Sequence, residues 1–235
     1  MGQPRILIVT TSNATMGPNG EPTGLWLEEL TTPYFTFAES GALVTLASIS
    51  GGIIPVDPRS RETGDAEAES VTRFHADGRA TGALDRSHAL ASIDGGSFDA
   101  IFLPGGHGTM WDLPCNATLA ALVSRMWRTG KVIGTVCHGA AGLLSAVEID
   151  GQPLVAGKRV TAFTDAEEEA VGLTEAVPFL LESRLRELGA LFESGETFAP
   201  HAIADGRLVT GQNPTSSLAT AKLVLDAVDA ASTVW

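Results

Sequence analysis

Short runs of consecutive apolar residues alternate along this chain with longer stretches in which apolar residues recur at helical spacing. Unbroken apolar runs are typical of strands buried on both faces of a sheet, and helical spacing is typical of the helices that cover them. The pattern predicts strands at 5–10, 43–48, 99–103, 132–136 and 159–163. It also predicts helices at 24–40, 113–128, 139–146, 177–188 and 214–231, and a hairpin with an Asp-Gly turn at 202–210.

The alternation of strands and helices predicts an α/β fold, in which helices cover both faces of a mainly parallel sheet. We expect a single domain over residues 1–235, because neither a repeat nor a linker interrupts the pattern. Residues 51–95 form an irregular insertion in this prediction, with the acidic run at 65–69 as a solvated helix or excursion. Ligands of such sheets bind beyond the carboxyl ends of the strands, so chemistry-bearing residues are sought there.

Acidic residues outnumber basic ones, and the net charge is −13. This balance argues against a nucleic acid or an anionic membrane surface as a partner. No apolar run approaches the roughly 20 residues that span a bilayer, and the N-terminus lacks a signal-peptide pattern. We therefore expect a cytoplasmic protein whose two cysteines, Cys115 and Cys137, do not form a disulfide.

The stretch around Cys137 is the strongest candidate for chemistry. The predicted strand 132–136 ends at this cysteine, and small residues then open the helix expected at 139–146. A sharp turn from strand to helix lifts the turn residue out of the sheet, and a helix N-terminus can lower a thiol pKa. Cys137 is therefore expected to be a thiolate nucleophile; the alternative is a buried, inert cysteine.

A glycine-rich loop, residues 104–109, follows the predicted strand 99–103. The successive glycines Gly105 and Gly106 let backbone N–H groups approach a ligand, where they could stabilise an oxyanion. The alternative is an ordinary tight turn. The loop lacks the lysine of a phosphate-binding loop, and His107 either lines the pocket or caps the turn.

A thiolate nucleophile needs a neighbour that handles protons. The predicted helix 24–40 offers Glu28 and Glu29. At about 100° per residue, Glu28 lies almost opposite the apolar face, whereas Glu29 lies at the edge of that face. Burial would raise the pKa of Glu29 and keep it protonated. The alternative is a pair of surface glutamates.

His138 directly follows Cys137. Adjacent residues at a sharp turn point apart, so its imidazole is expected at the pocket rim, as a base oriented by a carboxylate. Four acids after the predicted strand 159–163 are candidates for that carboxylate, although such a run usually faces water. They are Asp165, Glu167, Glu168 and Glu169. The remaining histidines do not show the spacing of zinc ligands.

In combination these residues resemble the ThiJ/PfpI superfamily, whose sheet is similar to that of class I glutamine amidotransferases. The resemblance runs from Arg5 to about Val228 and is strongest in the branch of heat-shock chaperones and glutathione-independent glyoxalases (glyoxalase III). Class I glutamine amidotransferases have a histidine and a glutamate near the C-terminus; here His201 stands at the position of the histidine, but Ile203 stands at that of the glutamate. This departure argues against amidotransferase activity. The segments that carry the resemblance are Glu29, 51–60, 105–112, 136–139, 163–165 and 210–214.

The resemblance implies a flavodoxin-like, doubly wound sheet and assigns roles by position. Cys137 would be the nucleophile and Glu29 its acidic partner. His138 would be the triad histidine and Glu168 the triad acid, with Asp165 as the second choice. The residues implied in oxyanion and substrate binding, beside the backbone of His138, are Gly105, Gly106, His107, Trp26, Trp111 and Asp165.

The implied activity is that of a cysteine-dependent lyase of the glyoxalase III, or D-lactate dehydratase, type. It would convert methylglyoxal or a related 2-oxoaldehyde to a 2-hydroxy acid through a Cys137 hemithioacetal. The sulfur replaces the thiol of glutathione, so no cofactor and no metal are expected. The implied partners are the small aldehyde substrate and a second copy of the chain in a homodimer, in a setting of stress response.

Two other classes of function suit the same cysteine. One is a cysteine-dependent hydrolase, namely a peptidase, amidase or deglycase. The other is a non-enzymatic holdase chaperone or thiol redox sensor, with Cys137 as the sensing thiol. A substrate screen without glutathione separates these alternatives.

Overall fold

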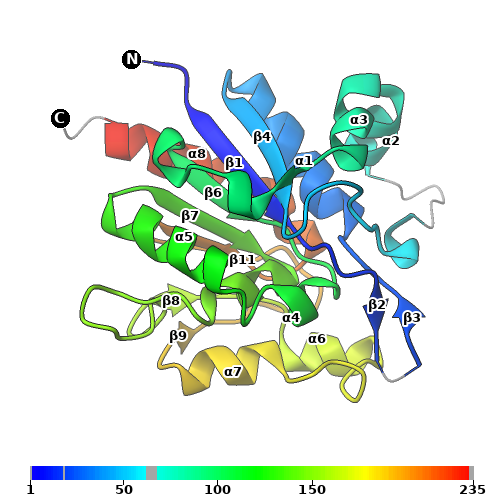
Figure 1. Ribbon diagram of the computed structural model, residues 1–235. Helices are drawn as coiled ribbons and strands as arrows, with labels where there is room; N and C mark the ends of the chain where they lie inside the picture. Colours follow the sequence, from blue (N-terminus) through cyan, green and yellow to red (C-terminus); the bar gives the residue numbers. More distant parts are fainter. Residues whose placement is uncertain (1, 18, 62–67, 233–235) are drawn as a thin grey trace.

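A seven-stranded sheet forms the centre of the molecule (Figure 1). The computed structural model describes residues 2–17, 19–61 and 68–232. The strands are parallel except β10, which runs antiparallel to β11. In sheet order the strands are β10 (Ala202–Asp205), β11 (Leu208–Gly211), β7 (Val132–Val136), β6 (Ala100–Leu103), β1 (Arg5–Thr10), β4 (Leu43–Ser48) and β5 (His88–Ala89).

The strand order confirms the predicted fold class. Apart from the two-residue edge strand β5, the parallel strands β4, β1, β6, β7 and β11 are the second, first, third, fourth and fifth in chain order, which is the flavodoxin-like, doubly wound arrangement. Every residue of β6, β7 and β11 is buried, as unbroken apolar runs in a parallel sheet should be. The strand order reverses between β1 and β6, and such a switch point opens a crevice at the carboxyl ends of the strands.

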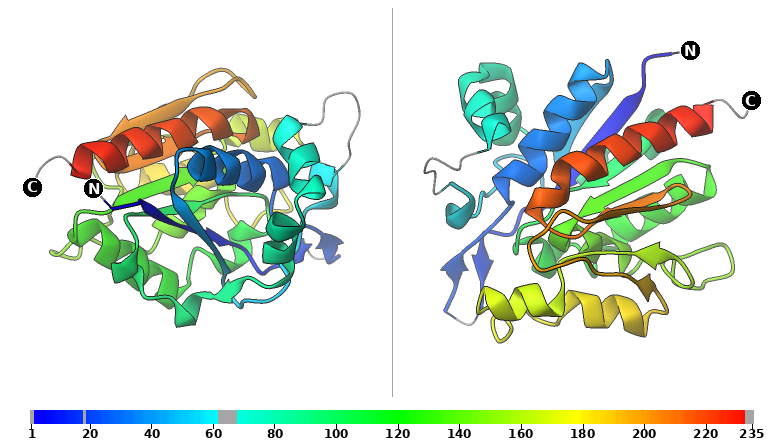
Figure 2. Two further views of the ribbon diagram at one scale, coloured as in Figure 1. Left: turned by 90° about the horizontal axis from the view of Figure 1, so that it is seen from above. Right: turned by 180° about the vertical axis from the view of Figure 1, so that it is seen from behind.

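Helices cover both faces of the sheet. On one face α1 (Leu27–Glu39) and α8 (Ser217–Ser232) lie side by side, and α5 (Ala117–Arg128) covers the other (Figure 2). The Phe37 and Phe102 rings meet edge to face at 5.5 Å between centroids and join α1 to β6. The 3₁₀ helix Pro214–Ser216 leads into α8. No helix in the described part of the chain is long and apolar enough to cross a membrane.

Three predicted helices differ from those in the structure. The helix expected at 113–128 begins only at Ala117, as α5, where the Asn116 side chain caps its first turn. The short helix α4 (Thr109–Asp112) before it was not predicted. The helix expected at 139–146 is a seven-residue 3₁₀ helix, Cys137–Leu143. The helix expected at 177–188 is reduced to α7 (Leu181–Glu187), which begins only after Pro178.

The strand expected at 159–163 is also much shorter. It consists of β8 (Arg159–Val160), which pairs with β9 (Leu191–Phe192) outside the main sheet. Thr161 then donates its backbone N–H to the Thr210 hydroxyl, so the ladder is interrupted. The chain turns into α6 (Asp165–Ala170), which lies at the same end of the molecule as α4 (Figure 1).

The segment 51–95 is more regular than expected. It contains α2 (Glu69–Ala76) and α3 (Gly78–Asp85), and α2 packs against α1. The acidic run at 65–69 lies largely outside the described residues. The remaining short elements are the 3₁₀ helices Pro58–Arg61, Leu90–Ser92 and Gly95–Ser97 and the small hairpin of β2 (Thr15–Met16) and β3 (Glu21–Pro22).

Candidate active site

Cys137 occupies a strained turn directly after β7. Its φ is +56°, in the left-handed region that residues other than glycine rarely adopt. Such a conformation persists only where the surrounding structure holds it, and it is enriched at functional sites. The side chain is 3% exposed. The predicted sharp turn is therefore present, at the carboxyl end of a central strand.

Glu29 brings a carboxyl group from α1 to the Cys137 thiol. Gly105 donates its backbone N–H to Oε2 at 2.7 Å, while Oε1 is buried and has no hydrogen-bond partner among the described residues. Burial raises the pKa of Glu29 to about 8, against the lowering effect of the bonds from Gly105 and Cys137. Glu29 is thus protonated at neutral pH, and because Oε2 accepts a bond, the proton resides on Oε1.

The neighbouring Glu28 is only half-buried, and burial also raises its pKa. Glu29 is fully buried, so the helical phase that separated the two glutamates agrees with the structure. The pKa of Glu29 rises further than that of Glu28 because Glu29 is fully buried and its charged form loses its hydration.

Burial raises the pKa of the Cys137 thiol, and the neighbouring Glu29 carboxyl adds to this effect. The expected lowering of this pKa by a helix N-terminus is therefore wrong. The element that follows is a short 3₁₀ helix, and the lowering effect of the His138 backbone N–H is outweighed by burial and by Glu29. The resting thiol keeps its proton at neutral pH and needs a base to remove it.

His138 lies against the sulfur instead of at the pocket rim. Its Nδ1 is 3.3 Å from Cys137 Sγ, and its side chain is 1% exposed. The prediction that the two adjacent side chains point apart is wrong, because the left-handed turn at Cys137 brings both to one side. His138 Nε2 lies 2.7 Å from Glu168 Oε2. Since a carboxylate only accepts, Nε2 carries the hydrogen and the Nδ1 lone pair faces the thiol.

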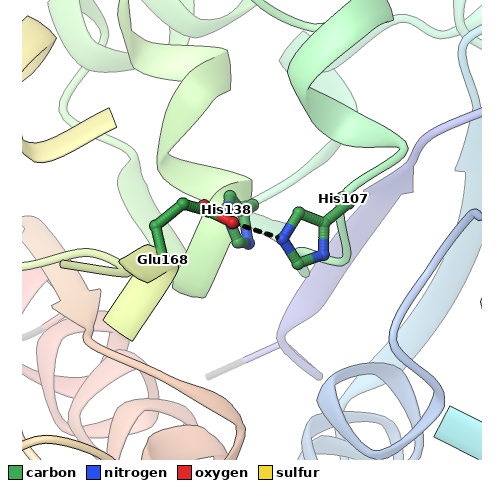
Figure 3. A group of neighbouring side chains, drawn as sticks. All are labelled: His107, His138 and Glu168. Atoms are coloured by element: carbon green, nitrogen blue, oxygen red, sulfur yellow. Dashed lines mark hydrogen bonds and ion pairs between the residues drawn. The ribbon is translucent and has the colours of Figure 1, made fainter. Parts of the chain in front are cut away.

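Glu168 is shared by two histidines (Figure 3). His107 Nε2 lies 2.8 Å from Oε1, while His138 is bonded to Oε2. Burial alone would raise the pKa of Glu168, but the hydrogen bonds from His107 and His138 outweigh it and hold this pKa well below its ordinary value. Glu168 is therefore an anion throughout the neutral range.

The other acids of this run lie elsewhere. Asp165 accepts hydrogen bonds from the backbone and hydroxyl of Ser183 and so ties α6 to α7, outside the pocket. Glu169 is exposed. Glu167 is fully buried and accepts from Gln212 and other groups behind the pocket. Among the four candidates, the structure brings Glu168 to His138, and the expected place of Asp165 in substrate binding is wrong.

His107 lines the pocket and connects it to an ion pair. Its Nδ1 accepts from Arg59 Nη2 at 3.2 Å, and Arg59 also binds both carboxylate oxygens of Asp57. Burial, with the neighbouring His138 as the next cause, lowers the pKa of His107 to about 4, so this imidazole is neutral. Sequence reasoning missed the roles of Asp57 and Arg59, although both lie in the segment 51–60 that carried the resemblance.

These groups surround a cavity of about 410 Å³. Buried polar side chains form its base, and partly exposed apolar side chains form its mouth. Val171, Phe198 and Pro214 at the mouth were not predicted; of these, only Pro214 lies in a segment that carried the resemblance. The lining consists of Trp26, Glu29, Arg59, Gly106, His107, Cys137, His138, Phe163, Val171, Phe198 and Pro214.

Two expectations about the pocket wall are wrong. Trp111 packs against the hydrophobic core and is absent from the cavity lining, whereas Trp26 is part of it. The Gly105 amide is bonded to Glu29 and is not free to bind an oxyanion. Gly106 does line the cavity, at φ +95°, and its Cα approaches the backbone of Gly24 too closely to admit a Cβ.

His107, His138 and Glu168 are the described residues whose donor atoms approach a metal-binding arrangement, all within 4.8 Å of one another. Each histidine, however, directs its Nε2 to a Glu168 oxygen at hydrogen-bond distance. Two N–H groups donating to one carboxylate account for this proximity. As arranged, the three side chains hold protons, and a metal ion would have to replace both hydrogen bonds.

Known proteins resemble the chain over nearly its whole length. Glyoxalase 3 of Candida albicans is 29% identical (95% of this chain, 98% of the relative), and glutathione-independent glyoxalase hsp3101 of Schizosaccharomyces pombe is 30% identical (94% and 93%). The crystal structure of Candida albicans glyoxalase III superposes with a TM-score of 0.86 at 28% identity (95% and 97%). Rapid Encystment Protein 24 KDa of Francisella tularensis superposes at 0.92 with 38% identity (96% and 99%). Residues 24–227 match the DJ-1/PfpI family, and the chain belongs to that family.

Proposed function

We propose that this protein is a glutathione-independent glyoxalase, which converts methylglyoxal or a related 2-oxoaldehyde and water to a 2-hydroxy acid. One observation carries the proposal: the Cys137 thiol lies between a base, His138, and a protonated acid, Glu29, at the base of one cavity. The names of full-length relatives support it. The residue roles below are part of the proposal.

The first step is addition of the sulfur to the aldehyde. His138 Nδ1 takes the thiol proton while Sγ bonds to the aldehyde carbon, C1. The carbonyl electron pair moves to oxygen, which takes the proton from Glu29 Oε1. The product is a hemithioacetal beside an imidazolium and a Glu29 carboxylate. Glu168 stabilises the imidazolium, and the amides of Gly106 and His138 are the proposed oxyanion donors.

The second step moves hydrogen between carbons. The Glu29 carboxylate removes the C1 proton, the ketone oxygen on C2 takes the imidazolium proton, and an enediol forms. Glu29 then protonates C2, while the C1 hydroxyl proton returns to His138 and C1 becomes a thioester. C1 is oxidised and C2 reduced by the same electron pair, so no external oxidant or reductant takes part.

Water completes the cycle. It adds to the thioester carbon with transfer of a proton to Glu29, the C1–Sγ bond breaks, and the sulfur takes the imidazolium proton. Cys137, His138 and Glu29 return to their starting protonation states, and the 2-hydroxy acid leaves. The Cys137 sulfur forms the hemithioacetal that an external thiol such as glutathione would otherwise form, so the reaction needs no glutathione.

A cysteine-dependent hydrolase is the second candidate function, because Cys137, His138 and Glu168, taken without Glu29, resemble a hydrolytic triad. The buried, protonated Glu29 favours the glyoxalase, because hydrolysis of an acyl group needs no second proton carrier beside the sulfur. The test measures lactate formed from methylglyoxal by the purified protein without glutathione. We expect wild type to form lactate and Cys137→Ser to form none. Hydrolysis of esters or peptides with no lactate formed would contradict the proposal.

We also propose that the protein works in the cytoplasm and as a homodimer. A free thiol nucleophile requires reducing surroundings, which the cytoplasm provides. The homodimer rests on resemblance to the family. Light scattering of the purified protein tests it, and a monomer mass at micromolar concentration would contradict it.

A further inference from the structure

Phe198 holds a strained conformation at the mouth of the cavity. Its φ is +60°, and Cys137 is the other non-glycine residue with positive φ in the described part of the chain. Phe198 is the third residue of a turn that closes with a bond from Ala199 N–H to Glu196 oxygen at 3.1 Å. Glycine or asparagine is favoured at such a position, so a phenylalanine there opposes the local preference. A backbone outlier held by its surroundings points to a function for the side chain.

The turn is fixed from both sides. Phe198 donates its backbone N–H to Glu167 Oε1 at 2.8 Å, and its carbonyl accepts from the Thr215 hydroxyl at 2.9 Å. Asn213 binds both Glu167 and the Ala199 carbonyl. Glu167 is fully buried on α6, directly before Glu168. The helix that supplies the partner of His138 therefore also sets the position of the Phe198 ring.

The Phe198 ring forms part of an apolar wall above the reacting groups. It is 43% exposed, lines the cavity, and lies 6.4 Å from the Phe163 ring, centroid to centroid. Trp26 and Val171 contribute to the same lining. The cavity, at about 410 Å³, is within the range of roughly 300–1,000 Å³ that suits ligands much larger than methylglyoxal.

The chemistry fixes which part of a substrate can reach this wall. C1 and C2 must both lie at the polar base, because each exchanges a proton with Glu29 beside Cys137. The substituent on C2 is the part that extends toward the mouth. In methylglyoxal this is a single methyl group, which is too small to cover the apolar wall.

We propose that Phe198 is a specificity-determining residue, and that the cavity takes 2-oxoaldehydes whose ketone carbon bears a bulky apolar, preferably aromatic, group. The aldehyde reaches Cys137, and the apolar group packs against Phe198 and Trp26. This inference rests on the proposed glyoxalase function and adds the substrate class.

The test compares kcat/KM for phenylglyoxal and methylglyoxal. Wild type is expected to favour phenylglyoxal by about tenfold or more, the effect of added apolar contact in a hydrophobic pocket. Phe198→Ala is expected to remove most of that preference. Phe198→Gly is expected to remove it equally while raising the Tm above that of Phe198→Ala, because glycine suits the positive φ.

Leu218→Ala is the matched control. Leu218 is 47% exposed but lies on α8 outside the cavity lining, so the preference and the Tm should stay as in wild type. No preference in wild type, or an unchanged preference in both Phe198 variants, would overturn the inference while methylglyoxal turnover left the proposed function standing. Wild-type protein that turns over neither aldehyde would overturn the proposed function itself.

Discussion

Glu29 and Glu168 have the same intrinsic acidity, but one is neutral and the other is an anion at the same site. Glu29 is fully buried, and this burial raises its pKa to about 8 in spite of the bonds from the Gly105 amide and the Cys137 thiol. Glu168 is also buried, but two imidazole N–H groups hold it as an anion. At the residue scale, the balance between burial and the strength of the donors that face a carboxyl group decides whether it provides a proton or a charge.

Glu29→Gln is expected to lower kcat/KM by about 10²-fold or more, the usual contribution of a general acid–base group. The amide keeps a donor but cannot transfer a proton. In wild type, kcat/KM should fall as the pH rises through about 8, because Glu29 then loses its proton. A pH–rate profile checks both statements. Glu28→Gln is the control, and greater sensitivity at Glu28 would contradict the assignment.

Glu29 should also make folding stability depend on pH. The folded state holds a proton up to pH about 8 that the unfolded state loses near 4.5. Because the folded state binds more protons in this window, the free energy of unfolding should fall as pH rises through it, by up to about 1.4 kcal/mol per pH unit. Denaturant unfolding across the window checks this. The same slope in wild type and Glu29→Gln would show that another group is responsible.

Glu168→Gln is expected to cost about 10²-fold or more in kcat/KM, since the carboxylate stabilises the His138 imidazolium. The amide presents one acceptor and one donor where two N–H groups point, so one histidine loses its partner. Glu169→Gln is the matched control, because Glu169 is the next residue and exposed. Steady-state kinetics measure both, and equal losses would refute a specific role for Glu168.

At the scale of elements, the fold was largely predictable, because buried parallel strands leave continuous apolar runs in the sequence. The helix expected at 113–128 was predicted to begin four residues too early, because a side-chain cap at Asn116 decides where it starts. The strand at 159–163 was predicted too long, because its pairing ends where the Thr161 backbone N–H donates to the Thr210 hydroxyl. Apolar patterning carries no information about such single polar contacts.

The site was predictable in part. The strand-to-helix turn identified Cys137, and helical phase separated Glu29 from Glu28. Glu168 was favoured only by resemblance, since the α6 capping box, in which Glu167 turns back to Thr164, is a structural detail. The bond between Arg59 and His107 joins positions 48 residues apart and leaves no local pattern.

The close contact of two elements gives a further prediction, at Gly139. A Cβ there would lie 2.0 Å from the Leu103 carbonyl oxygen, where the 3₁₀ helix after β7 meets the end of β6. Gly139→Ala is expected to lower the free energy of unfolding by about 3 kcal/mol or more. Gly78→Ala in α3 meets no atom within 4 Å and should be neutral or stabilising. Denaturant unfolding of both variants checks this, and equal stabilities would contradict it.

At the scale of the whole molecule, one end of the sheet gathers groups from distant parts of the chain. Glu29 comes from α1, His107 from the loop after β6, Cys137 from the turn after β7, and Glu168 from α6 beyond the sheet. The cavity lies where carboxyl ends of parallel strands converge, as the doubly wound order requires. The reaction proposed here uses only groups that this convergence provides.

Turnover of methylglyoxal is accordingly expected to survive exhaustive chelation, because the sulfur forms the covalent intermediate and Glu29 provides the proton. Activity before and after treatment with a strong chelator measures this. Loss of activity with recovery on adding zinc would contradict it. Such a result would direct attention to His107, His138 and Glu168, whose donor atoms lie within 4.8 Å of one another.

The sharing of Glu168 by two imidazoles limits how much positive charge the site can hold. One carboxylate compensates one imidazolium, and Arg59 already places a cation behind His107. When the thiol proton reaches His138, a second proton on His107 would be opposed from both sides. In the proposed mechanism, the thiol proton therefore stays on His138 while the carbon–sulfur bond forms, and this step needs no proton from bulk solvent.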